Sequence, residues 1–329
     1  MRVVKVEENK NNIVAKTNAL IGAKGHLSEA SQKMLAMVIS MIRADDTELT
    51  KYALKISDYT KMINSDSNNA QALKDRAEEL MRNPFWIGGK LFNWCSLVDV
   101  DDVPGYIVFD VHPLLKPHLL DLQNALGFTQ YSIVNILSLR GDYVPRLYEL
   151  FKMEFEQYKA QYKAKYKKTP KSYMFELDME WLREFMLIPD SYRYNDIKRN
   201  IIKKAEKQLE AKTDIKFSWQ EIKVGRKVTG LHIAISKNDK GSSDWLATRK
   251  AFIAHVREKY KPTPEDNIFP KIVSTNQGDL KLDKDGKLYM VANKKDLGIV
   301  DYDSMQSNKL WTWLYEQVKE NKLILEEIQ

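Results

Sequence analysis

The chain has 329 residues, of which 43% are hydrophobic and 29% charged. This length is enough for two or three domains with hydrophobic cores, and the composition excludes a disordered tail or a coiled-coil rod. No run of about 18 apolar residues exists, which excludes a membrane span, and we expect no secretory signal in residues 1–10. The single cysteine, Cys95, excludes an internal disulfide and a cysteine-based zinc site. We therefore expect a cytoplasmic protein.

The net charge of +7 is concentrated in one segment. Residues 152–236 carry 19 basic and 12 acidic residues, whereas residues 1–151 have a net charge of −1 and residues 237–329 of +1. A basic segment attracts polyanions such as nucleic acid. A solvated lysine-rich surface has the same composition, so the pattern inside the segment must distinguish the two interpretations.

Residues 1–141 follow the element order of a winged helix. Ser28 begins an apolar helical pattern that extends to about Ile42, Ser57 is the expected N-cap of a short helix, and Pro84 ends a longer one. Aromatic and β-branched segments with turn residues between them predict a hairpin. The predicted elements are helices after Ser28, at 58–63 and at 69–82, strands at 54–56, 85–87, 94–98 and 106–111, and further helical stretches at 114–122 and 131–139.

The same order recurs about 120 residues later. A long helix is predicted to begin near Tyr143 and to turn basic beyond Lys159. It is followed by a strand at 175–177, a short helix at 179–186, a long helix at 195–211, and a hairpin of 215–221 and 229–235 with Gly225 and Gly230 at its turn. We predict an α+β, mainly helical fold with two tandem winged helices, in domains 1–141 and 142–236.

Residues 237–329 are predicted to form a small C-terminal α/β domain whose role the sequence does not indicate. Residues 237–244 have the composition of a linker. The expected elements are a helix at 245–260, a hairpin of 280–282 with 288–291 across Asp285-Gly286, and a last helix around Trp311 and Trp313.

The helix predicted at 195–211 has an apolar face and a basic face. At about 100° per residue, an apolar stripe (Ile197, Ile201, Ala205, Leu209) lies opposite Arg199, Lys203 and Lys207, with Asn200 beside them. Arginine can read guanine and asparagine can read adenine in a major groove, and the following hairpin tip is basic. We predict base contacts by Arg199, Asn200 and Lys203. The full set of predicted DNA-binding residues is Arg193, Lys198, Arg199, Asn200, Lys203, Lys204, Lys207, Lys223, Arg226, Lys227, Asn69 and Lys74.

The corresponding helix at 69–82 is less suited to DNA. Its outer face mixes Gln71, Asp75, Glu78 and Arg82, and its hairpin carries Asp99, Asp101 and Asp102. Carboxylates repel phosphate. We therefore expect the second domain to supply most of the DNA-binding energy. The first domain is expected to make minor contacts, near Asn69 and Lys74, and to serve protein–protein contact.

Several segments resemble those of the iteron-binding plasmid replication initiators (Rep_3-type initiators), which are built from two winged helices. The most specific is the Arg146-Leu147-Tyr148-Glu149-Leu150 block at the start of a long helix. The others are Val14–Ile21, Phe128-Thr129-Gln130-Tyr131, Tyr194–Arg199 and Gly225–Val228. The likeness covers roughly residues 13–236. Pro145 departs from the pattern but fits a first helical turn, and residues 237–329 match nothing that we can place.

This resemblance implies a protein that binds directly repeated origin sites as a monomer and helps to melt adjacent AT-rich DNA. It implies double-stranded DNA, the host replication initiator and the replicative helicase as partners. It also implies a homodimer, formed through the first module, that represses its own gene. No membrane partner is expected.

Other functions are less consistent with the residues. The site of a nicking initiator endonuclease would resemble a metal held by two histidines with one residue between them. No two of the five histidines have this spacing, and His112 and His118 are the nearest pair. No Gly-rich phosphate-binding motif exists, and Asp283 and Asp285 lack the rest of a calcium loop. We expect no enzyme activity, no cofactor and no metal. A winged-helix transcriptional repressor without origin function is the main alternative.

Overall fold

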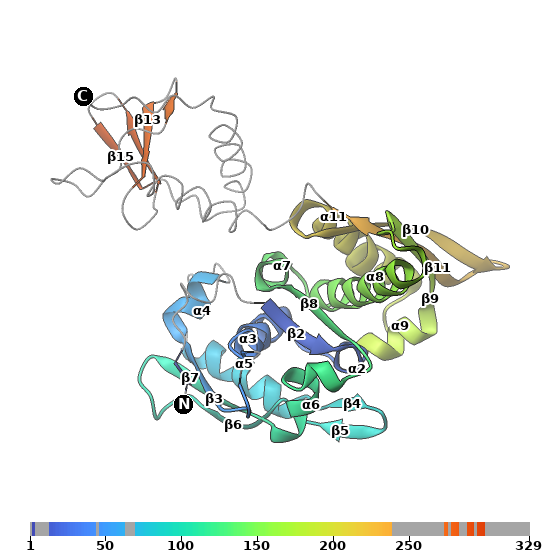
Figure 1. Ribbon diagram of the computed structural model, residues 1–329, viewed down its shortest axis with the longest axis horizontal. Helices are drawn as coiled ribbons and strands as arrows, with labels where there is room; N and C mark the ends of the chain where they lie inside the picture. The colour runs from blue at the N-terminus through green and yellow to red at the C-terminus, as the bar shows by residue number, and fades with distance from the viewer. Residues whose placement is uncertain are drawn as a thin grey trace. The chain divides into compact units, whose positions relative to one another are not determined.

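The computed structural model describes residues 2–3, 13–43, 46–62 and 70–238, and four strands between residues 273 and 299 (Figure 1). The chain divides into two compact units, Met1–Ser242 and Ser243–Gln329. The helices predicted at 245–260 and around Trp311 lie outside the described residues. In the described part of the chain, none of the helices has the length and apolar character that crossing a bilayer requires.

The first winged helix combines three helices with a four-stranded sheet. The helices are α3 (Glu29–Ile39), α4 (Ile56–Met62) and α5 (Ala70–Arg82). The sheet has the order β1 (Arg2–Val3), β3 (Lys51–Lys55), β7 (Tyr106–Val111), β6 (Cys95–Asp99). The helix predicted after Ser28 is α3, and Ser28 caps it, because its Oγ accepts a hydrogen bond from the Ser31 amide at 3.3 Å. The predicted cap Ser57 is wrong, since α4 already begins at Ile56.

Two small sheets and several short helices complete this half of the unit. Strand β2 (Ile13–Thr17) pairs antiparallel with β8 (Phe128–Ser132), and β4 (Phe85–Ile87) pairs with β5 (Lys90–Phe92). The short helices are α2 (Asn18–Ile21), α6 (Lys116–Leu119) and α7 (Ile133–Ser138), with 3₁₀ turns η1 (Pro113–Leu115) and η2 (Leu122–Asn124). The helices predicted at 114–122 and 131–139 are thus shorter than their apolar patterns, and Tyr131 lies in β8.

The second winged helix follows a long helix, α8 (Val144–Tyr166), which has Pro145 in its first turn as predicted. Its elements are β9 (Ser172–Asp178), α9 (Met179–Met186), α10 (Tyr194–Ile197), the π-helical segment η3 (Lys198–Ile202), α11 (Lys203–Lys212), β10 (Ile215–Val224) and β11 (Lys227–Lys237). The antiparallel sheet has the order β10-β11-β9. The predicted turn at Gly225 is confirmed, with a φ of +60°. Gly230, however, lies inside β11 opposite Ile222.

A buried ion cluster joins helix α8 to strands β2 and β8 of the first half of the unit. The Glu149 carboxylate accepts hydrogen bonds from Lys16 Nζ at 2.6 Å and from the Tyr131 hydroxyl, and Arg146 Nη1 lies 3.4 Å from it. Burial alone would raise the pKa of Glu149, but the charges of Lys16 and Arg146 hold this pKa below its ordinary value. Lys16 is on β2 and Tyr131 on β8, so the cluster fixes both strands to α8.

The same helix also contacts the second winged helix. The Arg146 guanidinium lies 4.7 Å from the Phe185 ring of α9 and donates to the Ala23 carbonyl at 2.7 Å. Tyr148 donates to Asp214 Oδ1 at 2.9 Å, just before β10. Side chains of the Arg-Leu-Tyr-Glu-Leu block therefore make contacts with both halves of unit Met1–Ser242.

The four C-terminal strands form a sheet of their own, β12 (Val273–Thr275), β13 (Gly278–Leu282), β14 (Leu288–Ala292) and β15 (Lys295–Ile299), in that order. Strands β13 and β14 pair antiparallel, with Leu282 opposite Leu288. The predicted pairing of 280–282 with 288–291 is confirmed, and the predicted Asp285-Gly286 turn lies outside the described residues.

We predict that Glu149→Ala lowers the free energy of unfolding by about 3–5 kcal/mol, because it leaves Lys16 and Arg146 buried without their carboxylate. Urea unfolding measures this change. Glu210→Ala, at an exposed position on α11, is the matched control and should change the free energy by less than about 0.5 kcal/mol. A loss of this small size for Glu149→Ala would contradict the assigned role of the cluster.

Candidate nucleic-acid interface

The predicted recognition helix is one continuous helix formed by α10, η3 and α11. Ile197, Ile201, Ala205 and Leu209 are each 0% exposed. Arg199, Asn200, Lys203, Lys204 and Lys207 are exposed, which confirms the apolar and basic faces of the helical wheel. The π-helical turn was not predicted. Its wider turn coincides with two adjacent buried side chains, Ile201 and Ile202.

Short-range contacts orient Arg199 at the start of this helix. Asp196 Oδ2 accepts a hydrogen bond from the Arg193 amide at 3.0 Å, and Asp196 Oδ1 lies 3.3 Å from Arg199 Nη2. Arg199 Nε also donates to Asn200 Oδ1 at 3.1 Å. The Arg199 side chain remains 74% exposed, so these contacts restrain it without covering it. Such exposed pairs are worth about 0–1 kcal/mol and exchange readily for other partners.

Glu221 links the wing, β10 and β11, to the recognition helix. Its carboxylate accepts from Lys198 Nζ at 2.7 Å, from Lys223 Nζ at 2.8 Å and from the Tyr194 hydroxyl at 2.7 Å. These hydrogen bonds lower the pKa of Glu221 to about 2. Lys198 Nζ also lies 5.5 Å from the Trp219 ring centre. Lys198 is therefore attached to the wing of its own protein.

Apart from Arg199, which pairs with Asp196, the predicted DNA-binding cations of the second winged helix form two groups. Lys198 and Lys223 contact Glu221, and Lys227 Nζ lies 3.3 Å from Glu180 in a pair with both side chains exposed. Five further cations are exposed and make no ion pair with any described residue: Arg193, Lys203, Lys204, Lys207 and Arg226. The second group is the more available to a nucleic acid.

In the corresponding part of the first winged helix, the predicted DNA-binding lysine is paired within the protein and the hairpin is acidic. Lys74 Nζ lies 3.0 Å from Asp101, so this helix residue pairs with the turn between β6 and β7. Asp99 in the same hairpin accepts hydrogen bonds from the amides of Asp101 and Asp102 at 3.0 Å. Asn69, the other residue predicted here, lies outside the described residues.

Glu221, Trp219 and Glu180 were not singled out from the sequence. A signal for the first two existed, because Trp219, Glu221 and Lys223 are spaced by two and therefore share one face of strand β10. Nothing local in the sequence indicates that this face meets the start of the recognition helix.

Comparison with known proteins now identifies the family. Residues 13–152 match the family model described as Initiator Replication protein, WH1, and residues 178–235 match Initiator Rep protein, WH2. The chain belongs to the initiator replication protein family. The resemblance and the two tandem winged helices expected from the sequence are confirmed.

Two solved structures are similar to this initiator. One is the crystal structure of Pi initiator protein in complex with iteron DNA, with 17% sequence identity and a TM-score of 0.55 over 70% of this chain and 99% of that chain. The other contains domains 2 and 3 of RctB, with 9% identity and a TM-score of 0.39 over 63% and 80% of the two chains. The likeness to Pi extends the shared fold across both winged helices.

We predict that the wing remains attached to the recognition helix until the pH falls well below 4. The folded-state pKa of Glu221, about 2, is lower than its unfolded value of about 4.3. Its contribution to stability is therefore complete above about pH 4.3 and is lost as the pH falls towards 2. The difference in unfolding free energy between the unsubstituted protein and Glu221→Gln should shrink over this range. A difference that is constant between pH 5 and pH 2 would contradict the assignment.

Proposed function

We propose that this family member is a plasmid replication initiator that binds directly repeated origin sites, the iterons, in double-stranded DNA. The observation that supports this most strongly is the exposed basic face of α10–α11, beside a wing that Glu221 joins to the same helix. A helix and an adjacent wing can contact a groove and the flanking phosphates together. Pi initiator protein, which shares this fold, was crystallised with iteron DNA.

Within this proposal the exposed residues have different roles. Arg199, Asn200 and Lys203 contact base edges in the major groove. Arg193, Lys204, Lys207 and Arg226 contact phosphates. Lys227 joins them by exchanging Glu180 for phosphate, at little cost because the pair is exposed. Lys198 and Lys223 act through Glu221 and hold the wing in place.

The remaining functions follow from the same proposal. Domain 142–236 supplies the main DNA contact, and domain 1–141 forms the homodimer that represses the initiator gene. The acidic hairpin of the first winged helix supports a protein-binding role, because it repels phosphate. Binding energy, the host initiator and the replicative helicase open the origin.

The deciding experiment is to sequence DNA fragments from the encoding element that the purified protein retains. Retention of a tandem array of direct repeats supports origin binding. Retention of a lone inverted repeat favours a winged-helix repressor without origin function. Metal-dependent cleavage of supercoiled origin DNA would instead support a nicking enzyme, and no enrichment at any salt concentration would contradict DNA recognition altogether.

We predict that Arg199→Ala weakens binding to the repeat by about 1–3 kcal/mol and relaxes the preference at one base pair. The reason is that a bidentate arginine contact distinguishes guanine from the other bases. Binding should be measured on the repeat and on a set of single base-pair substitutions. Equal weakening on every sequence would show that Arg199 contacts the backbone instead.

We predict that Lys207→Ala weakens binding to all sequences alike and makes the salt dependence shallower by about one unit, because one phosphate contact is lost. Lys171→Ala is the matched control. Lys171 is exposed before β9, whose first residue pairs with Ser236, at the end of the sheet remote from the wing tip. An unchanged slope for Lys207→Ala, or the same change in both variants, would contradict a specific phosphate contact.

A further inference from the structure

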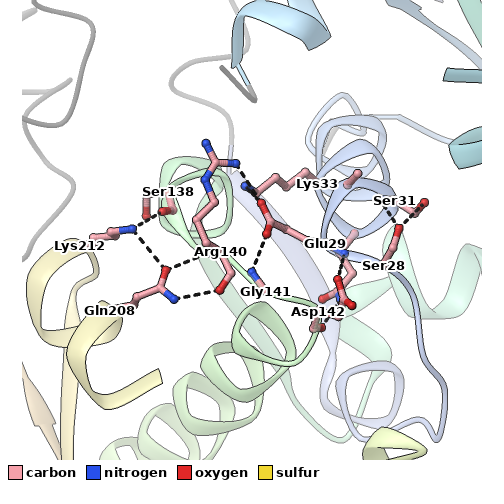
Figure 2. A network of polar contacts seen from close by, with 12 residues as sticks. Ser28, Glu29, Ser31, Lys33, Ser138, Arg140, Gly141, Asp142, Gln208 and Lys212 are labelled. Atoms are coloured by element: carbon pink, nitrogen blue, oxygen red, sulfur yellow. Dashed lines mark hydrogen bonds and ion pairs between the residues drawn. The ribbon is translucent and has the colours of Figure 1, made fainter. Parts of the chain in front are cut away.

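Segment Ser138–Asp142, the Ser138–Asp142 loop, consists of the last residue of α7 and the residues that lead to α8, and the recognition helix holds it from one side (Figure 2). Gln208 of α11 pairs with the main chain of Arg140 in both directions. Its Oε1 accepts from the Arg140 amide at 2.8 Å, and its Nε2 donates to the Arg140 carbonyl at 2.8 Å. Lys212 Nζ donates to the Ser138 carbonyl at 3.0 Å. Gln208 is only 9% exposed, so this pairing is shielded from water.

The first winged helix holds the same loop from the other side, also in Figure 2. Glu29, the first residue of α3, lies 2.9 Å from Arg140 Nη1 and accepts from the Gly141 amide at 2.5 Å. The Glu29 amide donates to Asp142 Oδ1 at 2.9 Å. Lys33, which is 0% exposed, lies 2.6 Å from Glu29 and fixes its carboxylate.

The conformation of the loop requires a glycine at position 141, for which there are two reasons. Gly141 has a φ of +97°, which L side chains rarely adopt. A Cβ at this position would lie 2.5 Å from Lys204 Nζ of the recognition helix. The loop therefore has close neighbours on both sides, and its polar groups are paired with α3 and α11.

The contacts continue from α3 to α5, the helix that occupies the recognition position of the first winged helix. Glu79 of α5 accepts hydrogen bonds from the amide and the hydroxyl of Ser28, both at 2.6 Å, and from the Ser31 hydroxyl at 2.5 Å. Ser28 and Ser31 lie at the start of α3, next to Glu29. Hydrogen bonds thus connect α5, α3, the Ser138–Asp142 loop and α11 without interruption.

We propose that Gln208 and Glu29 are positioning residues that set the placement of the two recognition helices, α5 and α11, relative to each other. The minor DNA contact of the first winged helix then falls at one fixed distance from the main contact of the second, and the protein distinguishes sites by the distance between their two halves. This inference rests on the proposed DNA-binding function and adds a determinant of specificity that touches no base.

Gln208→Ala is the decisive variant, because it removes no charge and changes no residue proposed to contact DNA. Gln161→Ala is the matched control, at an exposed position on α8 where the glutamine makes no hydrogen bond with any described residue. Binding is measured on the native repeat, on repeats with one to five base pairs inserted between the halves, and on the half bound by the second winged helix. Thermal unfolding of both variants reports on folding.

We expect Gln208→Ala to bind the native repeat roughly tenfold more weakly, within the range typical of coupling between sites. Its preference for the native spacing over the inserted spacings should fall, while binding to the isolated half-site is unchanged. An equal loss on all sites, including the half-site, would overturn the proposal, because Gln208 would then act on the recognition helix alone. Unchanged spacing preference would overturn it too.

A readout without DNA separates this inference from the proposed function. Spin labels on Glu78→Cys of α5 and Ala211→Cys of α11, in a Cys95→Ala background, report the distance between the two helices. We expect a narrow distribution in the otherwise unsubstituted protein and a broad one with Gln208→Ala. Equally narrow distributions would overturn the inference even if the protein binds iterons. Broadening in a protein that binds no repeat would refute the proposed function and leave the positioning role supported.

Discussion

The fold depends on the buried Glu149 carboxylate and the cations around it. Removing an ion pair from water costs several kcal/mol per ion, and this cost is recovered only when every partner is in place. Lys16 and Tyr131 come from β2 and β8, whereas Arg146 comes from the same helix as Glu149. The cluster is therefore satisfied only after two strands more than 100 residues apart have paired with each other and docked on α8.

From this cluster the contacts extend to the DNA-facing part of the molecule. Arg146 reaches Phe185 of α9, and Tyr148 reaches Asp214, which immediately precedes β10. The apolar stripe of the recognition helix packs into the same core, which includes Leu147 and Phe151 of α8. Since one helix serves both winged helices, a disturbance at its start affects the strands of the first and the recognition helix of the second.

The sequence was sufficient for the elements whose signals are local. The alternation of the β10–β11 hairpin, the Gly225 turn and the 3.6-residue stripe from Ile197 to Leu209 all indicate their structures directly, because each depends on residues close along the chain. The prediction that Ser57 caps α4 was wrong for the same reason. Serine is a favourable cap residue by its local signal, but the helix begins one residue earlier. No local signal in the sequence indicated the π-helical turn, which coincides with the two adjacent buried side chains Ile201 and Ile202.

The candidate site was predictable as a surface but not as a set of contacts. A count of basic residues in the sequence does not distinguish one exposed cation from another. In the structure, Lys198 and Lys223 form ion pairs with Glu221. Lys203 and Lys207 form no ion pair with any described residue. Lys198 and Glu221 are 23 residues apart, so only the fold brings them together. Tertiary pairing thus decides which basic residues fix the protein to itself and which remain available to a ligand.

Helix α11 with its preceding turn has three kinds of neighbour, each on a different face. Its apolar face packs in the core with α8, Gln208 and Lys212 hydrogen-bond the Ser138–Asp142 loop, and Lys203 and Lys207 face solvent. The three faces tolerate change differently. An apolar side chain suits the first face, and a charged side chain suits the third face or, as Lys212 shows, the second where a carbonyl accepts its hydrogen bond. The second face needs one donor and one acceptor in a fixed geometry, because the Arg140 main chain presents one of each. The planar amide of Gln208 offers both groups side by side and pairs with the Arg140 amide and carbonyl at once, so this face requires a particular geometry as well as a polar side chain.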